Sequence, residues 1–226
     1  MNTLLLLSEI IISFASIIIL YEKYNKEGIY IWLMIATVFG NIMITKSISI
    51  SNLNINLGII VIATIFVCSN FLIQKEGEKE TNKILLLVFI TSIISNIIFL
   101  LISKTNISTI NIISDKAFNN LFINNIILYI TNTIVLLVTL KINNYIYYKV
   151  KLLENKIWIA NIISMIMSQT IYGVLIGSMY LAYINNYLDL IIIIVIRFLL
   201  AILTQVLGTI LIYYLNTKKH KGGNVI

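Results

Sequence analysis

Seven apolar stretches divide this sequence, and each is close to the twenty or so residues that cross the hydrocarbon core of a bilayer. Hydrophobic residues make up 59% of the 226 residues and charged residues only 11%, so a soluble domain of this length could not bury the apolar surface. The sequence therefore predicts an all-α integral membrane bundle with about seven transmembrane helices. The stretches cover residues 3–20, 29–45, 57–73, 84–102, 121–140, 157–183 and 187–215.

The lysines between these stretches are distributed unevenly. If successive stretches cross the membrane in alternate directions, twelve of the fifteen lysines fall on one side, and only Lys46, Lys104 and Lys116 fall on the other. Cytoplasmic loops carry an excess of lysine, so the pattern predicts an outside N-terminus and a cytoplasmic C-terminus. Six crossings would break this alternation, so the lysines favour seven. The cytoplasmic set is Lys23, Lys26, Lys75, Lys79, Lys83, Lys141, Lys149, Lys151, Lys156, Lys218, Lys219 and Lys221.

The chain is predicted to be one transmembrane domain over residues 1–216, followed by a basic cytoplasmic tail over residues 217–226. The first stretch lacks the basic start and cleavage site of a signal peptide, so we expect a retained helix. The polar segments 74–83 and 141–156 are expected to be cytoplasmic loops, and Gly77 favours a helix stop with a solvated turn in the first of them. The net charge of +7 is explained by topology and attraction to anionic lipid, and no direct nucleic-acid partner is expected.

Residues that catalysis or metal binding would need are scarce. Cys68, the single cysteine, lies in the third stretch, whereas His220, the single histidine, lies in the tail. A thiol protease needs a thiolate beside an imidazole, and a metal site needs several such ligands together. We therefore predict no enzyme activity, no metal and no cofactor. An intramembrane peptidase stays as a minor alternative, in which Cys68→Ala would remove a measurable activity.

Polar side chains inside the apolar stretches are costly in lipid and therefore mark function or helix packing. Arg197 lies roughly 13 Å inside the last stretch at 1.5 Å per residue. By the same rise, Asn41, Gln169 and Tyr172 are predicted to share its layer, somewhat outside the midplane. Glu9 lies near the outer end of the first stretch, where a carboxyl that reaches the headgroups and a functional carboxyl are both open interpretations.

A second polar layer is predicted nearer the cytoplasm. Asn70 and Gln74 lie four residues apart on one helix face, and Asn161 enters the sixth stretch at a similar depth. Two polar layers would suit a small polar solute that moves between them, and the alternative is hydrogen bonding between helices. Gly173 and Gly177 form a G-x-x-x-G step that favours close helix packing beside this region.

Several blocks of the chain resemble one known family. Residues 24–46, YNKEGIYIWLMIATVFGNIMITK, resemble the start of the queuosine precursor transporter family, also called the VUT family. Residues 58–81, GIIVIATIFVCSNFLIQKEGEKET, are similar to its next helix and charged turn, and residues 158–180 and 195–215 are similar to its last two core helices. The resemblance implies a six-helix core, preceded here by an extra N-terminal span, and import of a queuosine precursor.

The resemblance also implies solute contacts. Three of these positions depart from the family pattern, because Asn70, Gln74 and Tyr172 stand where members have Asp, Glu and Asp. An amide keeps shape and hydrogen bonding without charge, and it can pair with a purine edge through one donor and one acceptor. Tyr172 would stack on a base, and the lost carboxylates argue against proton coupling through these positions. The implied contacts are Asn41, Lys46, Asn70, Gln74, Asn161, Gln169, Tyr172 and Arg197.

We therefore predict a multi-pass transporter of the cell membrane that imports preQ0, preQ1, queuine or a related purine-like base. Its predicted partners are the lipid bilayer and this small solute. One alternative is a substrate-binding component that needs a separate energising module and takes another solute. A second is a non-transporting membrane scaffold or sensor. The exact solute, the coupling ion and the oligomeric state, including a homo-oligomer, stay open.

Overall fold

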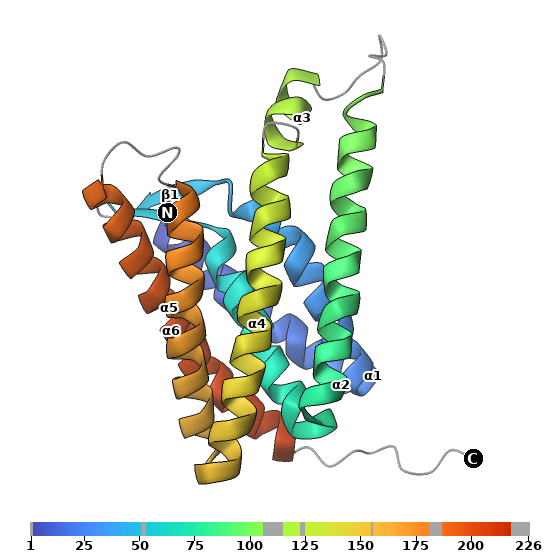
Figure 1. Ribbon diagram of the computed structural model, residues 1–226, viewed down its shortest axis with the longest axis vertical. Coiled ribbons are helices and arrows are strands. Elements are labelled where there is room, and N and C mark those ends of the chain that lie inside the picture. The colour runs from blue at the N-terminus through green and yellow to red at the C-terminus, as the bar shows by residue number, and fades with distance from the viewer. Residues whose placement is uncertain are drawn as a thin grey trace.

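The computed structural model describes residues 2–50, 53–105, 115–122, 125–154, 156–180 and 187–217. Over these residues the chain forms a bundle of long helices with one short β-hairpin, as Figure 1 shows, which confirms the expected all-helical class. In chain order the elements are α1 (Asn2–Met43), β1 (Ser47–Ile50), β2 (Leu53–Asn56), α2 (Gly58–Ile102), α3 (Asp115–Phe122), α4 (Ile126–Glu154), α5 (Ile157–Tyr180) and α6 (Tyr187–Thr217).

Five helical segments of the described chain are long and apolar enough to cross a membrane. They are α1, α2, the segment Ala117–Glu154 that contains α4, and most of α5 and α6. With 42 and 45 residues, α1 and α2 exceed what one crossing needs, since about twenty residues suffice. Leucine, isoleucine and valine side chains cover much of the outer faces, an arrangement that suits contact with lipid.

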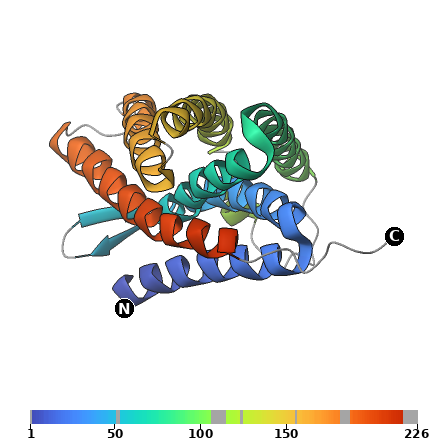
Figure 2. The ribbon, with the colours of Figure 1, turned by 90° about the horizontal axis from the view of Figure 1, so that it is seen from below.

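Both α1 and α2 turn back on themselves at one residue. Asn25 has φ 52° and ψ −132°, and Gly77 has φ 82° and ψ 168°, so neither continues the helix. Positive φ is the region that glycine adopts freely and asparagine tolerates. Figure 2 shows the blue ribbon of α1 running out and returning, and Figure 1 shows α2 reversing in the same way. We call the parts before and after each turn the first and second arms. The turn predicted at Gly77 is confirmed.

The first arm of α2 is the central element of the bundle. Every residue from Gly58 to Ile73 in it is buried. It contacts α1, α4 and α6, and the main apolar cluster joins it to the second arm of α1 and to the facing sides of α4, α5 and α6. A helix that is apolar and buried on all sides needs neighbours all round it. The polar side chains that it carries therefore face other helices rather than lipid.

Two parts of the chain differ from the sequence expectation. Residues 141–154 were expected to be a loop, but they continue α4, with Asn143, Asn144 and Tyr147 buried while Lys141 and Tyr145 are exposed. The segment is an amphipathic helix end whose average polarity conceals its buried face. The antiparallel hairpin of β1 and β2, which pairs Ser47 to Ile50 with Asn56 to Leu53, was not expected at all. Residues 181–183 of the sixth predicted stretch and residues 218–226 of the predicted tail lie outside the described residues.

Candidate functional site

Polar side chains, all of them uncharged except Arg197, form two networks inside the bundle. We call them the Tyr172 network and the Asn70 network. Each draws members from several helices, so neither is a local turn or cap. The Tyr172 network consists of Asn41, Ser92, Asn132, Thr133, Tyr172 and Arg197. The Asn70 network consists of Asn70, Asn143, Asn161, Ser164, Ser168 and Thr209.

The Tyr172 network begins at Asn41, near the end of the second arm of α1. Its Nδ2 donates to Thr133 Oγ1 on α4 at 2.8 Å and to Ser92 Oγ on α2 at 3.1 Å. Its Oδ1 accepts a hydrogen bond from Asn132 Nδ2 at 2.5 Å. One amide of α1 therefore connects to both α2 and α4 in the buried interior, where each bond lacks competition from water.

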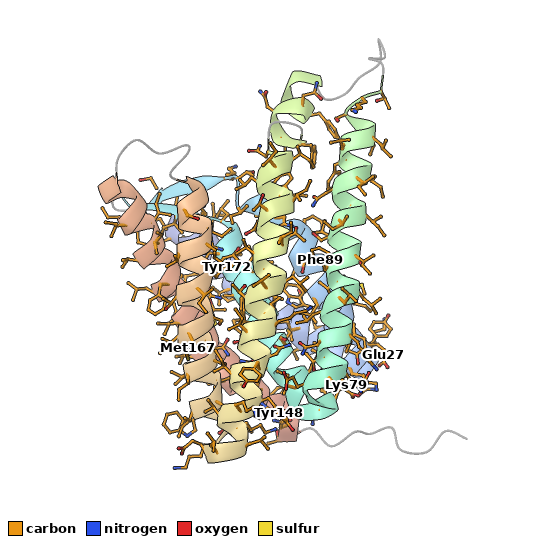
Figure 3. All side chains as sticks on the ribbon, viewed as in Figure 1. Glu27, Lys79, Phe89, Tyr148, Met167 and Tyr172 are labelled. Atoms are coloured by element: carbon orange, nitrogen blue, oxygen red, sulfur yellow. The ribbon has the colours of Figure 1, made fainter. Side chains whose placement is uncertain are left out.

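Tyr172 and Arg197 complete this network from α5 and α6. The Tyr172 hydroxyl donates to Asn132 Oδ1, and the Arg197 guanidinium lies over the Tyr172 ring with 4.1 Å between Cζ and the ring centroid. Phe66 meets the same ring edge-on, with 6.5 Å between the ring centroids. Tyr172 is fully buried and Arg197 is 5% exposed, so the ring face is part of the environment that stabilises a buried cation. Figure 3 shows Tyr172 at mid-height of the bundle beside α4.

The Asn70 network surrounds the amide of Asn70 on the central arm of α2. Its Nδ2 donates to Asn161 Oδ1 on α5 at 2.8 Å, and its Oδ1 accepts from Asn143 Nδ2 on α4 at 2.7 Å. Asn161 in turn donates to Thr209 Oγ1 on α6 at 2.9 Å, and Ser168 Oγ donates to Asn143 Oδ1 at 3.3 Å. The amide at position 70 thus uses both its donor and its acceptor within the protein.

The remaining predicted contacts lie apart from these networks. Gln74, which is half-buried, donates to the Tyr147 hydroxyl at 2.5 Å and accepts from Asn216 Nδ2 at 2.8 Å. Gln169 is buried on α5, but its Nε2 has no hydrogen-bond partner. Lys46 is exposed where α1 gives way to the hairpin, and it belongs to neither network. The fold therefore joins Asn41 with Tyr172 and Arg197, joins Asn70 with Asn161, and leaves Lys46 at the surface.

Sequence reasoning missed several members of the interior. Asn132 and Asn143 belong to the networks, Asn144 binds Ser69 and Asn82, and Gln205 is 1% exposed on α6. A signal for the α4 residues was available, because positions 129, 132, 136, 140, 143 and 147 share one helical face. Gln205 stands eight residues after Arg197, a spacing that returns to the same face of a helix.

Charged side chains gather at the end of the bundle where the turns at Asn25 and Gly77 lie. Lys26, next to the Asn25 turn, forms an ion pair with Glu76, next to the Gly77 turn, with 3.3 Å between Nζ and Oε1. The hydrogen bond from this ammonium to Glu76 raises the pKa of Lys26 above its ordinary value. Figure 3 shows Glu27 and Lys79 at this same end. Within the described ranges, no three His, Cys, Asp or Glu side chains lie close enough to hold a metal ion.

Comparisons with known proteins agree with this architecture. Residues 56–215, more than half of the chain, match the family described as "Putative vitamin uptake transporter". The chain is also 32% identical, over 81 residues, to the "Probable queuosine precursor transporter" of Bacillus subtilis (strain 168). That alignment covers 36% of this chain and 35% of the relative, so this chain spans about a third of the length of the curated relative it matches. No solved structure matches the chain.

The family match begins at residue 56, so the resemblance noted for residues 24–46 lies outside it. The match covers all of α2, α3, α4 and α5 and nearly all of α6. These elements carry the Asn70 network and all of the Tyr172 network except Asn41. Apolar helices of this kind and a transporter family together describe a multi-pass protein of the cell membrane. The chain therefore belongs to the vitamin uptake transporter (VUT) family, the family of the queuosine precursor transporters.

Proposed function

We propose that this protein imports a queuosine precursor or a related purine-like base, such as preQ0, preQ1 or queuine. The observation that carries the proposal is the set of uncharged amides and hydroxyls that runs through the interior from every long helix. Polar groups inside a membrane bundle mark solute pathways when they line its interior. Planar bases carry donors and acceptors at their edges, which amides can match.

The proposed topology has seven crossings, with the N-terminus outside and the C-terminus in the cytoplasm. The turns at Asn25 and Gly77 support it, because each of them divides one long helix into two arms that run in opposite directions. The lysine distribution supports the same orientation, since both turns and the end of α4 fall on its lysine-rich side. The Lys26–Glu76 ion pair then lies at the cytoplasmic end of the bundle.

The proposed solute contacts are the eight residues implied by family resemblance, with different roles. Asn70, Gln74 and Gln169 hydrogen-bond the edge of the base, and Arg197 positions its polar groups. Because Arg197 covers one face of the Tyr172 ring, a base that stacks on Tyr172 uses the other face. Because Asn70 already binds Asn143 and Asn161, a solute that reaches it exchanges those hydrogen bonds for its own.

Restoration of queuosine in tRNA tests the proposal directly. The gene is expressed in cells that lack their own queuosine synthesis and precursor transport, and preQ0, preQ1 or queuine is supplied singly. We expect restoration with at least one of them. Absence of restoration with all three, while the protein is found in the membrane, would contradict the proposed solute class. Uptake without any added partner would argue against the need for a separate energising module.

A second candidate function keeps the same fold but another solute. The family description names vitamin uptake, and this chain has the neutral side chains Asn70 and Gln74 where the family resemblance implies carboxylates. A substrate-binding component for another small, uncharged solute would use the same interior. Dependence of uptake on a co-expressed energising module, with no response to queuosine precursors, would favour this second candidate.

A further inference from the structure

Two buried amides between the networks lack hydrogen-bond partners. Gln205 on α6 is 1% exposed, and neither its Nε2 nor its Oε1 has a partner. Gln169 on α5 is 5% exposed, and its Nε2 has none. Buried polar atoms in folded proteins are nearly always paired, so each orphan calls for an explanation. The buried amides of Asn41, Asn70 and Asn143, which belong to the two networks, are all paired. The two glutamines differ from them in this respect.

The register of α5 against α6 places the two glutamines at similar levels along the bundle. Asn161 hydrogen-bonds Thr209 at one level, and Tyr172 meets Arg197 at another, so the two helices are antiparallel with both glutamines between these levels. At 1.5 Å per residue, Gln169 lies about 12 Å from the first level and Gln205 about 6 Å from it, which leaves about 6 Å between them along the helix axes.

The direction of the side chains reduces this separation further. In a helix every Cα–Cβ bond tilts toward the N-terminus. Since α5 and α6 run in opposite directions, the tilt of Gln169 is toward the level of Gln205 and that of Gln205 is toward the level of Gln169. The two amides nevertheless do not bond each other, because the atoms in question have no partner. Two donors and one acceptor are thus left free in one part of the interior.

Other orphan atoms do not share this position. Among the described side chains, Asn96 Nδ2 and Glu9 Oε1 are also buried without partners. Asn96 belongs to the second arm of α2 and Glu9 to the first arm of α1, so neither is on the α5–α6 pair. Among the residues that the structure describes, α5 and α6 carry unpaired buried side-chain atoms at these two glutamines: a donor on Gln169, and a donor and an acceptor on Gln205.

We propose that Gln205 and Gln169 bind the lactam edge of an uncharged planar heterocycle. This rests on the proposed function, and it adds Gln205 as a specificity-determining residue. A lactam presents an adjacent N–H and C=O, and a primary amide pairs with both at once. Gln205 Oε1 accepts the ring N–H, Gln205 Nε2 donates to the ring carbonyl, and Gln169 Nε2 donates to a second acceptor. The deazaguanine ring of preQ0 carries such an edge.

The test uses purified protein in detergent and titration with preQ0 and with its N1-methyl derivative, which lacks the ring N–H. Gln205→Met and Gln169→Met keep approximate side-chain size while they remove the amides. The matched control is Thr204→Val, since Thr204 is buried on the same helix and its hydroxyl donates to the backbone carbonyl of Leu200.

We expect N1-methylation to weaken binding to the unaltered protein at least tenfold. Gln205→Met should weaken preQ0 binding at least tenfold and abolish the difference between the two ligands, whereas Thr204→Val should leave both affinities unchanged. The unliganded melting temperature of Gln205→Met should stay the same or rise, because an unpaired buried amide has been removed. The comparison of preQ0 with its N1-methyl derivative uses the unaltered protein, so it tests the inference even if a variant fails to fold.

Three results would overturn the inference. Equal binding of both ligands to the unaltered protein would exclude pairing at the ring N–H. Unchanged preQ0 affinity in Gln205→Met, with a lower unliganded melting temperature, would assign the amide to packing or to a buried water. Binding of neither ligand by the unaltered protein, together with failed queuosine restoration by all three precursors, would overturn the proposed function as well.

Discussion

The Arg197 guanidinium lies 4.1 Å from the centroid of the Tyr172 ring, and both side chains are shielded from solvent between α5 and α6. The described ion pairs are Lys26–Glu76 and Lys83–Glu80, so this arginine forms none with a described carboxylate. A buried cation is costly without compensation, and a ring face can supply part of it. The family resemblance implies a carboxylate at position 172, whereas this chain has the aromatic ring of Tyr172 there.

Two substitutions of Tyr172 separate the roles of its ring and its hydroxyl. Tyr172→Phe keeps the face under Arg197 and loses the hydrogen bond to Asn132, so we expect a loss of about 1 kcal/mol in stability. Tyr172→Leu also removes the face, and we expect about 2 kcal/mol more to be lost. Unfolding in detergent measures both. Equal losses for the two variants would show that the ring does not stabilise the guanidinium.

Asn70 and Gln169 are predicted to be needed for uptake rather than for folding. Asn70→Leu breaks the bonds to Asn143 and Asn161, and hydrogen bonds between membrane helices contribute about 0.6 kcal/mol on average, so the protein should persist in the membrane. Gln169→Leu removes an amide whose Nε2 is unpaired and should cost still less stability. We expect loss of precursor uptake in both, with normal protein amounts by immunoblot. Retained uptake in both variants would remove these residues from the pocket.

Most of the helical plan could be predicted because apolar length is a strong signal, and Gly77 could be located as a turn because alternating charges surround it. The continuation of α4 past Lys141 could not be predicted from average polarity. Its exposed Lys141 and Tyr145 dominate the composition, while Asn143 and Tyr147 face the bundle. The β1–β2 hairpin was missed although both strands, SISI and LNIN, alternate polar and apolar residues. Four residues are too few to separate such an alternation from chance in a chain this rich in isoleucine and asparagine.

Depth along each helix was enough to predict that Asn41, Tyr172 and Arg197 share a layer. Depth does not give the rotation of a helix about its axis, and rotation decides which of many asparagines face inward. Asn132 joins Asn41 to Tyr172. Depth alone does not select it, although its spacing from Tyr129 and Leu136 places it on the buried face of α4. Gln205 was overlooked for the same reason, although its spacing from Arg197 places both on one face.

Gly208 allows α6 to approach the central arm of α2. A Cβ at this position would lie 2.4 Å from Val67 Cγ2 and 3.1 Å from Val67 Cβ, and the branched valine has little rotamer freedom to move away. We expect Gly208→Ala to lose about 1 to 3 kcal/mol of stability. Gly173→Ala is the control, because its Cβ would meet Ile194 Cγ2 at an ordinary 3.4 Å. Adding Val67→Ala to Gly208→Ala should recover part of the loss, and no recovery would mean that another contact sets the cost.

The turns at Gly77 and Asn25 should respond differently to substitution, because each has a positive φ that glycine adopts more easily than other residues. Gly77 has φ 82° and ψ 168°, and a Cβ added there would meet no atom within 4 Å, so Gly77→Ala should lose about 1 to 3 kcal/mol through backbone strain alone. Asn25 has φ 52°, a value that glycine adopts freely, so Asn25→Gly adds no backbone strain and should lower stability less than Gly77→Ala does. Melting temperatures in detergent compare the two. A stable Gly77→Ala protein would show that the turn can adopt negative φ.

The orientation of the chain can be read from two single cysteines on either side of the second arm of α2. Cys68 is 1% exposed, and its removal by Cys68→Ala gives a background without thiols. Lys79 and Lys104 are both exposed at the two ends of that arm, so each can carry a reactive cysteine. On intact cells, a membrane-impermeant maleimide should label Lys104→Cys and should reach Lys79→Cys only after lysis. The reverse pattern would invert the proposed orientation. Equal labelling of both would mean that the second arm of α2 does not cross the membrane, and the seven-crossing topology would then fail.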